Sequence, residues 1–124
     1  MKSLLSKLKP KNCISNAKAM EMREHWVATR AKAIESELGF TDTRDVVWSV
    51  KDLEEYLAYV KRESVAQGIE NPGVRVNFAA YKDTNRASLF FSPTVNPSEN
   101  SGSNYEIECF NLGGAGWPPN DFGD

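Results

Sequence analysis

Residues 45–92 constrain the fold more than any other part of this chain. They contain an apolar segment at 45–48 that is typical of a short strand, an amphipathic helix at 49–67, and two alternating segments at 74–92 that predict an antiparallel hairpin. A helix and a hairpin in this order predict an α+β domain, because each element must bury its apolar face against the other.

The helix at 49–67 has signals at both of its ends. Ser49 and Asp52 resemble a capping box with the shorter acidic residue, and Gly68 is a typical terminating glycine. The apolar residues recur at helical spacing and predict the buried face, which comprises Val50, Leu53, Leu57 and Val60.

Alternation in the hairpin assigns its residues to two faces of a sheet. We expect the more apolar row to face the helices, namely Val74, Val76, Phe78, Ala80, Ala87, Leu89 and Phe91. A further alternating segment at 105–110 predicts a third strand, with Tyr105, Ile107 and Cys109 facing inward. The opposite face of the sheet would then remain open.

A second long helix is predicted before this region, ending at Gly39. Together the elements predict an α+β two-layer sandwich, in which two main helices pack on one face of a three- to four-stranded, mainly antiparallel sheet. Residues 15–112 would form this single domain, between a basic N-terminal arm at 1–14 and a Gly/Pro-rich C-terminal tail at 113–124.

The chain has 124 residues, and none of its apolar runs approaches the ~20 residues that a membrane-spanning helix needs. Its first residues lack the sustained apolar segment of a secretory signal. We therefore expect a cytoplasmic protein with no transmembrane segment. Because cytoplasmic thiols are normally reduced, Cys13 and Cys109 are expected to be free and mostly buried, and a disulfide between them is the alternative.

Charge is distributed unevenly along the chain. Residues 1–32 carry eight basic and two acidic residues, a net charge of +6, whereas the remaining residues carry seven basic and fifteen acidic ones, a net charge of −8. We expect the basic segment to dock on the acidic part of the same chain, and contact with an anionic membrane surface is the alternative. The acidic body argues against nucleic acid as a partner, because that binding depends on neutralising phosphates.

A pattern of apolar, aromatic and acidic residues extends across the first strand, the helix and the second strand. It comprises Val47, Trp48, Ser49, Val50, Asp52, Leu53, Glu54, Tyr56, Leu57, Tyr59 and Val60, followed by Gly68, Gly73, Arg75, Val76 and Tyr81. With this pattern, residues 46–93 resemble a group of small uncharacterised bacterial proteins. The chain departs from the group at Asn77, where an aromatic residue is usual, and at Ala79, where glycine is usual. The resemblance implies an α+β fold and carries over no activity, cofactor or site residue.

No local pattern indicates catalysis. His25 is the single histidine, so neither a His-rich zinc site nor a local Ser-His-Asp or Cys-His arrangement is visible. Glu106 and Glu108 would lie on an exposed strand, which does not favour acid–base chemistry. The glycine-rich segment at 113–116 lacks the lysine of a phosphate-binding loop. We expect no catalytic residue, no metal and no cofactor, and we favour a binding protein over an enzyme.

The open sheet face and the tail supply the candidate binding residues, which are Arg75, Asn77, Phe90, Glu106, Glu108, Phe110 and Trp117. Aromatic side chains beside charges on an uncovered face favour a small soluble protein-binding module with a protein partner or self-association. Ion pairs between strands would explain the charges without any function. The alternative function is a small enzyme or ligand-binding domain, with a carboxylate-containing cleft between the loop at 94–104 and the sheet.

Overall fold

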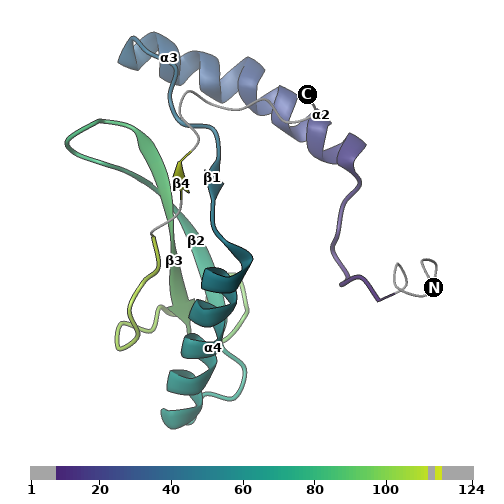
Figure 1. Ribbon diagram of the computed structural model, residues 1–124, viewed down its shortest axis with the longest axis vertical. Helices are drawn as coiled ribbons and strands as arrows, with labels where there is room; N and C mark the ends of the chain where they lie inside the picture. The colour runs from purple at the N-terminus through teal and green to yellow at the C-terminus, as the bar shows by residue number, and fades with distance from the viewer. Residues whose placement is uncertain (1–7, 112–113, 116–124) are drawn as a thin grey trace. The chain divides into compact units, whose positions relative to one another are not determined.

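The structure is a computed structural model that describes residues 8–111 and 114–115 (Figure 1). These residues form two compact units, one containing residues 8–41 and the other containing the described residues from 42 onward. The arm and tail boundaries expected at residues 14 and 112 stay predictions.

The first unit is helical. Its three segments follow one another without a break, and the middle one is a π-helix: α2 (Asn16–Trp26), η1 (Val27–Ala31) and α3 (Lys32–Leu38). The Ser15 hydroxyl caps α2 by accepting a hydrogen bond from the Lys18 amide at 3.0 Å. Gly39 ends α3 with φ at 81°, in the left-handed region that glycine adopts without strain. The predicted helix is confirmed here, with a wider turn inside it.

The second unit contains one helix and two pairs of strands: β1 (Val46–Val47), α4 (Val50–Ala66), β2 (Gly73–Ala80), β3 (Ala87–Thr94) and β4 (Gly114–Ala115). β1 pairs with β4 and β2 pairs with β3, both in the antiparallel sense. The Ser49 hydroxyl accepts a hydrogen bond from the Asp52 amide at 2.9 Å, so the predicted cap is confirmed. The chain therefore has the predicted α+β fold.

Aromatic side chains attach α4 to the strands. The core and the residues packed against it are Tyr56, Val60, Ile107, Tyr59, Phe91 and Phe110. The Tyr56 ring stacks on Phe110 with 4.9 Å between centroids, and it lies 6.4 Å from the ring of Phe91. Trp48 contacts Phe91 edge to face at 5.0 Å. The core therefore lies between α4, β3 and the segment that ends at Phe110. On the predicted buried face of α4, Val60 is buried as expected, whereas Val50 and Leu57 are 72% and 38% exposed, so their predicted burial is wrong.

The strand predicted at 105–110 is wrong except at its last residue. Phe110 forms a single antiparallel bridge with Phe91. Before this bridge the chain turns, because the Asn104 side chain accepts a hydrogen bond from the Glu106 amide at 3.2 Å. Asparagine bonds of this kind offer the backbone an alternative to an extended ladder.

This turn changes which side chains of the segment are buried. Ile107 is buried, as expected, at 3% exposure, whereas Tyr105 is 93% exposed. Phe110, which was expected on the open face, packs in the core instead. Cys13 and Cys109 are free thiols, as expected, but both are exposed, so their predicted burial is wrong.

α4 lies on the predicted face of the hairpin, but it does not cover β2. Phe91 of β3 packs against the core, as expected. On the same face of β2, however, Val74, Val76 and Phe78 are 39%, 49% and 93% exposed. The predicted burial of these three residues is therefore wrong, because α4 packs over β3 and the segment beyond it.

Candidate functional site

Three of the predicted site residues lie together. Arg75, Asn77 and Phe90 share one face of the hairpin, and Asn77 is directly opposite Phe90. All three are half-buried. The Asn77 amide donates to the Ser92 hydroxyl at 2.9 Å, so its polar atoms are partly bound inside the hairpin.

The loop after β3 holds the guanidinium of Arg75. Arg75 donates to the Ser101 carbonyl at 2.6 Å and to the Ser103 hydroxyl at 3.2 Å. Ser101 itself is only 8% exposed. This face is therefore partly occupied by the protein's own loop, and two guanidinium nitrogens of Arg75 already donate to neutral oxygens of that loop.

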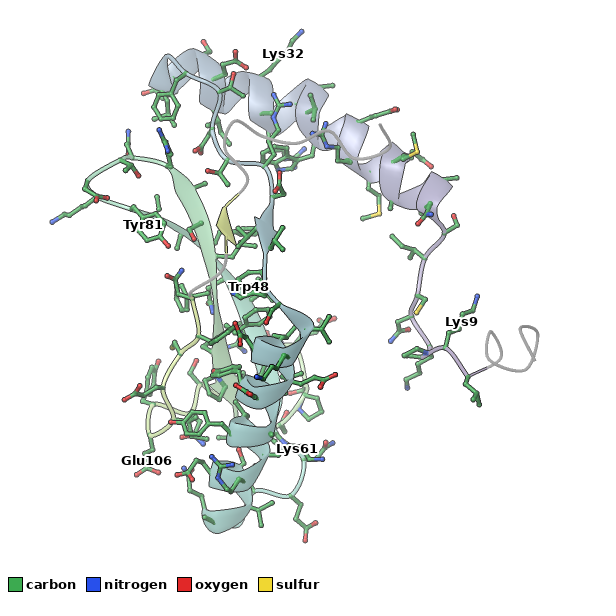
Figure 2. All side chains as sticks on the ribbon, viewed as in Figure 1. Lys9, Lys32, Trp48, Lys61, Tyr81 and Glu106 are labelled. Atoms are coloured by element: carbon green, nitrogen blue, oxygen red, sulfur yellow. The ribbon has the colours of Figure 1, made fainter. Side chains whose placement is uncertain are left out.

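The other predicted residues lie elsewhere. Glu106 and Glu108 are exposed, and Glu106 extends from the turn into solvent (Figure 2). Phe110 belongs to the core, and Trp117 lies outside the described residues. The structure thus does not bring the seven residues into one surface, and a binding role for any of them stays a prediction.

The hydrogen bonds of β3 show how the backbone of the hairpin is oriented. Phe91 exchanges backbone hydrogen bonds of 2.8 and 3.0 Å with Phe110, and the Pro93 carbonyl accepts from the Asn104 amide at 2.9 Å. Phe91 and Pro93 therefore direct their backbone groups away from β2. Proline lacks an N–H, and at this position the β2–β3 ladder requires none.

The outer edge of β2 follows from this orientation. Residues directly opposite in an antiparallel pair either exchange hydrogen bonds or both point away from each other. Val74 is opposite Pro93 and Val76 is opposite Phe91, so both valines, and Phe78 by alternation, point their backbone groups away from β3. Among the described residues, no other strand pairs with β2. We call the backbone and side chains of Val74, Val76 and Phe78 the β2 edge.

The β2 edge is apolar, exposed and uncharged. The single charged residue of β2 is Arg75, whose side chain lies on the other face. Exposed strand edges are commonly protected by lysine, by proline or by a bulge, because their free backbone groups pair readily with another chain. Residues 73–80 contain no lysine, no acidic residue and no proline. The β2 edge is therefore suited to accept an additional strand.

The sequence pattern predicts that Val74, Val76 and Phe78 lie in the core, so it does not indicate the β2 edge. The available signal is the absence of charge and proline on the alternate positions of β2. A strand covered by a helix shows the same absence, so the signal does not distinguish a covered row from an open one.

A cavity of about 340 Å³ lies at the start of β2, and its lining residues are Gly73, Val74, Arg75, Thr94, Pro97, Ser98 and Glu99. It occupies the place expected for a cleft between the loop and the sheet, and Glu99 supplies a carboxylate. A Cβ atom at Gly73 would lie 2.5 Å from the Thr94 Oγ1 atom, so the loop packs here against bare backbone.

A second cavity, of about 540 Å³, lies in the first unit and is lined by Glu21, Met22, His25, Trp26 and Arg30. It adjoins η1, where the Thr29 hydroxyl donates to the His25 carbonyl at 2.7 Å. Groups of three or more potential metal ligands do not occur among the described residues.

Comparisons with protein-family models, with curated proteins and with solved structures gave no match. The resemblance of residues 46–93 to small bacterial proteins therefore stays a prediction. In the described part of the chain, no helix has the length and apolar character that crossing a membrane requires.

Proposed function

We propose that this protein is a non-enzymatic interaction module that binds an extended segment of a protein chain at the β2 edge. The observation that carries the proposal is that the same three residues combine outward backbone groups with exposed apolar side chains. A strand added to such an edge gains main-chain hydrogen bonds, and its alternate side chains pack on the exposed row.

Phe78 is the main anchor of this proposed surface. It is 93% exposed, and complete burial of a phenylalanine side chain contributes ~1.5–3 kcal/mol. Val74 and Val76 are already half covered and contribute less. Each new main-chain hydrogen bond adds a net ~0.5–1.5 kcal/mol. Phe78 therefore supplies most of the side-chain contribution to the binding affinity.

A protein partner suits this surface better than nucleic acid does. The β2 edge carries no charged side chain, and the nearest cation, Arg75, is already bonded to Ser101 and Ser103. Binding to nucleic acid requires cationic groups that neutralise phosphates. The proposed partner strand is apolar at alternate positions, so that it matches the exposed row.

The proposed setting of this interaction is the cytoplasm. Cys13 and Cys109 are both exposed and free. Exposed thiols persist in reducing compartments and pair or oxidise in oxidising ones. This observation supports a cytoplasmic location, which a localisation experiment on the tagged chain in its native cell would test.

Affinity purification from the native cell tests the proposed function. The tagged wild-type chain is compared with Phe78→Lys and with Tyr105→Lys, because Phe78 and Tyr105 are equally exposed at 93%. We expect a stoichiometric protein partner to be retained by the wild type and by Tyr105→Lys, and lost by Phe78→Lys. Equal recovery of every partner with all three chains would contradict the proposal.

A small ligand-binding domain or enzyme is the second candidate, and the cavity at the start of β2 favours it. Arg75 and Glu99 line the cavity together, so it offers opposite charges to a small polar molecule. Screening small polar metabolites by thermal denaturation tests this reading, with Glu99→Gln as the variant. A ligand that stabilises the wild type but not Glu99→Gln would support it, and a screen without such a ligand would count against it.

A further inference from the structure

We infer that the strand that pairs with the β2 edge is β2 of a second copy of this chain, running antiparallel about a two-fold axis. This inference rests on the proposed function and names its partner. In such a pair each copy contributes the same three residues, and the two hairpins join into one sheet of four strands.

The orientation of the backbone is compatible with self-pairing. Only residues that point their N–H and C=O groups outward can bond to an added strand, and in β2 these are Val74, Val76 and Phe78, with Ala80 next in the alternation. When two identical strands pair about a two-fold axis, the axis can pass through a residue whose backbone groups point outward, or midway between two such residues. In both cases each outward-pointing residue of one copy lies opposite an outward-pointing residue of the other copy. The copies can thus satisfy each other's backbone groups along the whole edge.

The side chains of β2 restrict which residues face each other. An axis at Arg75 would place two guanidinium groups directly opposite, which is destabilising. Axes at Val76 or at Asn77 avoid this, because they place Arg75 opposite Asn77 or Ala79 of the partner subunit. Both arrangements place Phe78 opposite a valine of the partner subunit. Both of these arrangements therefore bury Phe78 of both copies.

Charge and sheet size favour a second copy over an unrelated strand. The β2 edge has no charge, so it selects a partner strand whose matching row is equally uncharged, and the row of Val74, Val76 and Phe78 in a second copy meets this requirement. The β2–β3 sheet has only two strands in the described part of the chain, and such hairpins are marginally stable alone. Self-pairing doubles the sheet and continues the exposed row of one copy into that of the other.

Analytical ultracentrifugation of the purified full chain over a range of concentrations tests the inference. A reducing agent is present throughout, because the exposed Cys13 and Cys109 thiols would otherwise cross-link copies. We expect a dimer that dissociates on dilution. Each dimer contains the Phe78→Lys change twice, so this variant is expected to weaken dimerisation by roughly 100-fold or more, whereas Tyr105→Lys leaves it unchanged.

A backbone variant tests the mode of pairing separately. Val76→Pro removes an N–H that the β2–β3 ladder does not use, so the hairpin is retained while pairing between copies is lost. Circular dichroism and reversible unfolding of each variant show whether it remains folded. The inference would be overturned if Tyr105→Lys were folded but monomeric. It would also be overturned if Phe78→Lys and Val76→Pro were folded and still dimeric.

The same variants distinguish failure of the inference from failure of the proposed function. A wild-type monomer at all concentrations, with a different protein captured in a Phe78-dependent manner, overturns self-pairing and supports the proposed function. If the wild type is a monomer and every captured protein is recovered equally with Phe78→Lys, both self-pairing and the proposed function are overturned.

Discussion

Tyr56 places a polar group inside an aromatic core. The residue is 6% exposed, and its hydroxyl donates to the Glu108 carbonyl at 2.9 Å. Burial raises the pKa of Tyr56 from 10.0 to about 12, and the charges of Cys109 and Tyr59 act in the same direction. The core therefore accommodates the neutral phenol and disfavours the phenolate.

This pKa predicts how stability depends on pH. Between pH 10 and about 12 the unfolded chain has released a proton that the folded chain retains, so raising the pH favours unfolding. The contribution of Tyr56 to the slope is at most ~1.4 kcal/mol per pH unit. Denaturant titrations through this range are expected to show a steeper loss for the wild type than for Tyr56→Phe. Parallel losses in the two chains would contradict the role of Tyr56.

Gly73 is a position where packing excludes a side chain. A Cβ atom there would meet Thr94 Oγ1 at 2.5 Å and the Asn96 carbonyl oxygen at 2.9 Å. Gly73→Ala is therefore expected to lower the free energy of unfolding by ~1–3 kcal/mol. Gly102→Ala is the matched control, because nothing lies within 4 Å of its Cβ position. Chemical denaturation of both variants checks this, and equal stabilities would show that the loop yields at no cost.

The sequence predicted the helices, the first strand and the two strands of the hairpin, but it also predicted a strand at 105–110 that forms only one bridge, and it did not predict β4. The Ser49 cap, the Gly39 terminus and the alternation in the hairpin are local properties, and the structure confirms each of them. The same alternation correctly placed Asn77 and Phe90 on one face, because opposite residues of an antiparallel pair share a face.

Packing between elements was less predictable. The position of α4 depends on contacts of Tyr56 with Phe91 and Phe110, which are distant in the sequence. An apolar row has the same pattern whether a helix covers it or not, so the exposure of the β2 edge could not be read from residues 74–78. The turn at 104–107 likewise depends on a side-chain hydrogen bond that competes with strand pairing.

Two substitutions in the segment at 105–110 test this arrangement. Phe110→Ala removes a ring that stacks on Tyr56, and because Phe110 is half-buried we expect a loss of ~2–3 kcal/mol in the free energy of unfolding. Tyr105→Ala changes a residue that is 93% exposed and is expected to stay within ~0.5 kcal/mol of the wild type. If residues 105–110 formed a regular strand, Tyr105 would face inward and Phe110 outward. Thermal or chemical unfolding would then show a larger loss of stability for Tyr105→Ala than for Phe110→Ala.

The β2 edge connects binding with stability. The sheet of β2 and β3 has two strands in the described part of the chain, and α4 supports it over β3 alone. Any strand that binds the folded chain and not the unfolded chain raises its stability, by an amount that grows with the logarithm of the ratio of strand concentration to Kd. The apparent stability of the wild type should therefore rise with protein concentration if copies pair.

Hydrogen exchange gives a residue-level measurement of this pairing. The amides of Val74, Val76 and Phe78 point away from β3 and are expected to exchange rapidly in a dilute sample. In a concentrated sample they should become protected, while the amides of Arg75 and Asn77, which bond to β3, are protected in both. Phe78→Lys should remove only the concentration-dependent part, and protection that is the same at all concentrations would contradict pairing at this edge.

The two edges of the hairpin differ in whether a further strand can pair with them. On the far side of β3, Phe91 is already bonded to Phe110, and Pro93 has no N–H to offer. A molecule that can add a strand on one side only reaches a closed pair and stops, because growth into a fibril requires two complementary edges on every chain. The asymmetry of this hairpin therefore allows an apolar, uncharged strand to remain exposed without the hazard of amyloid.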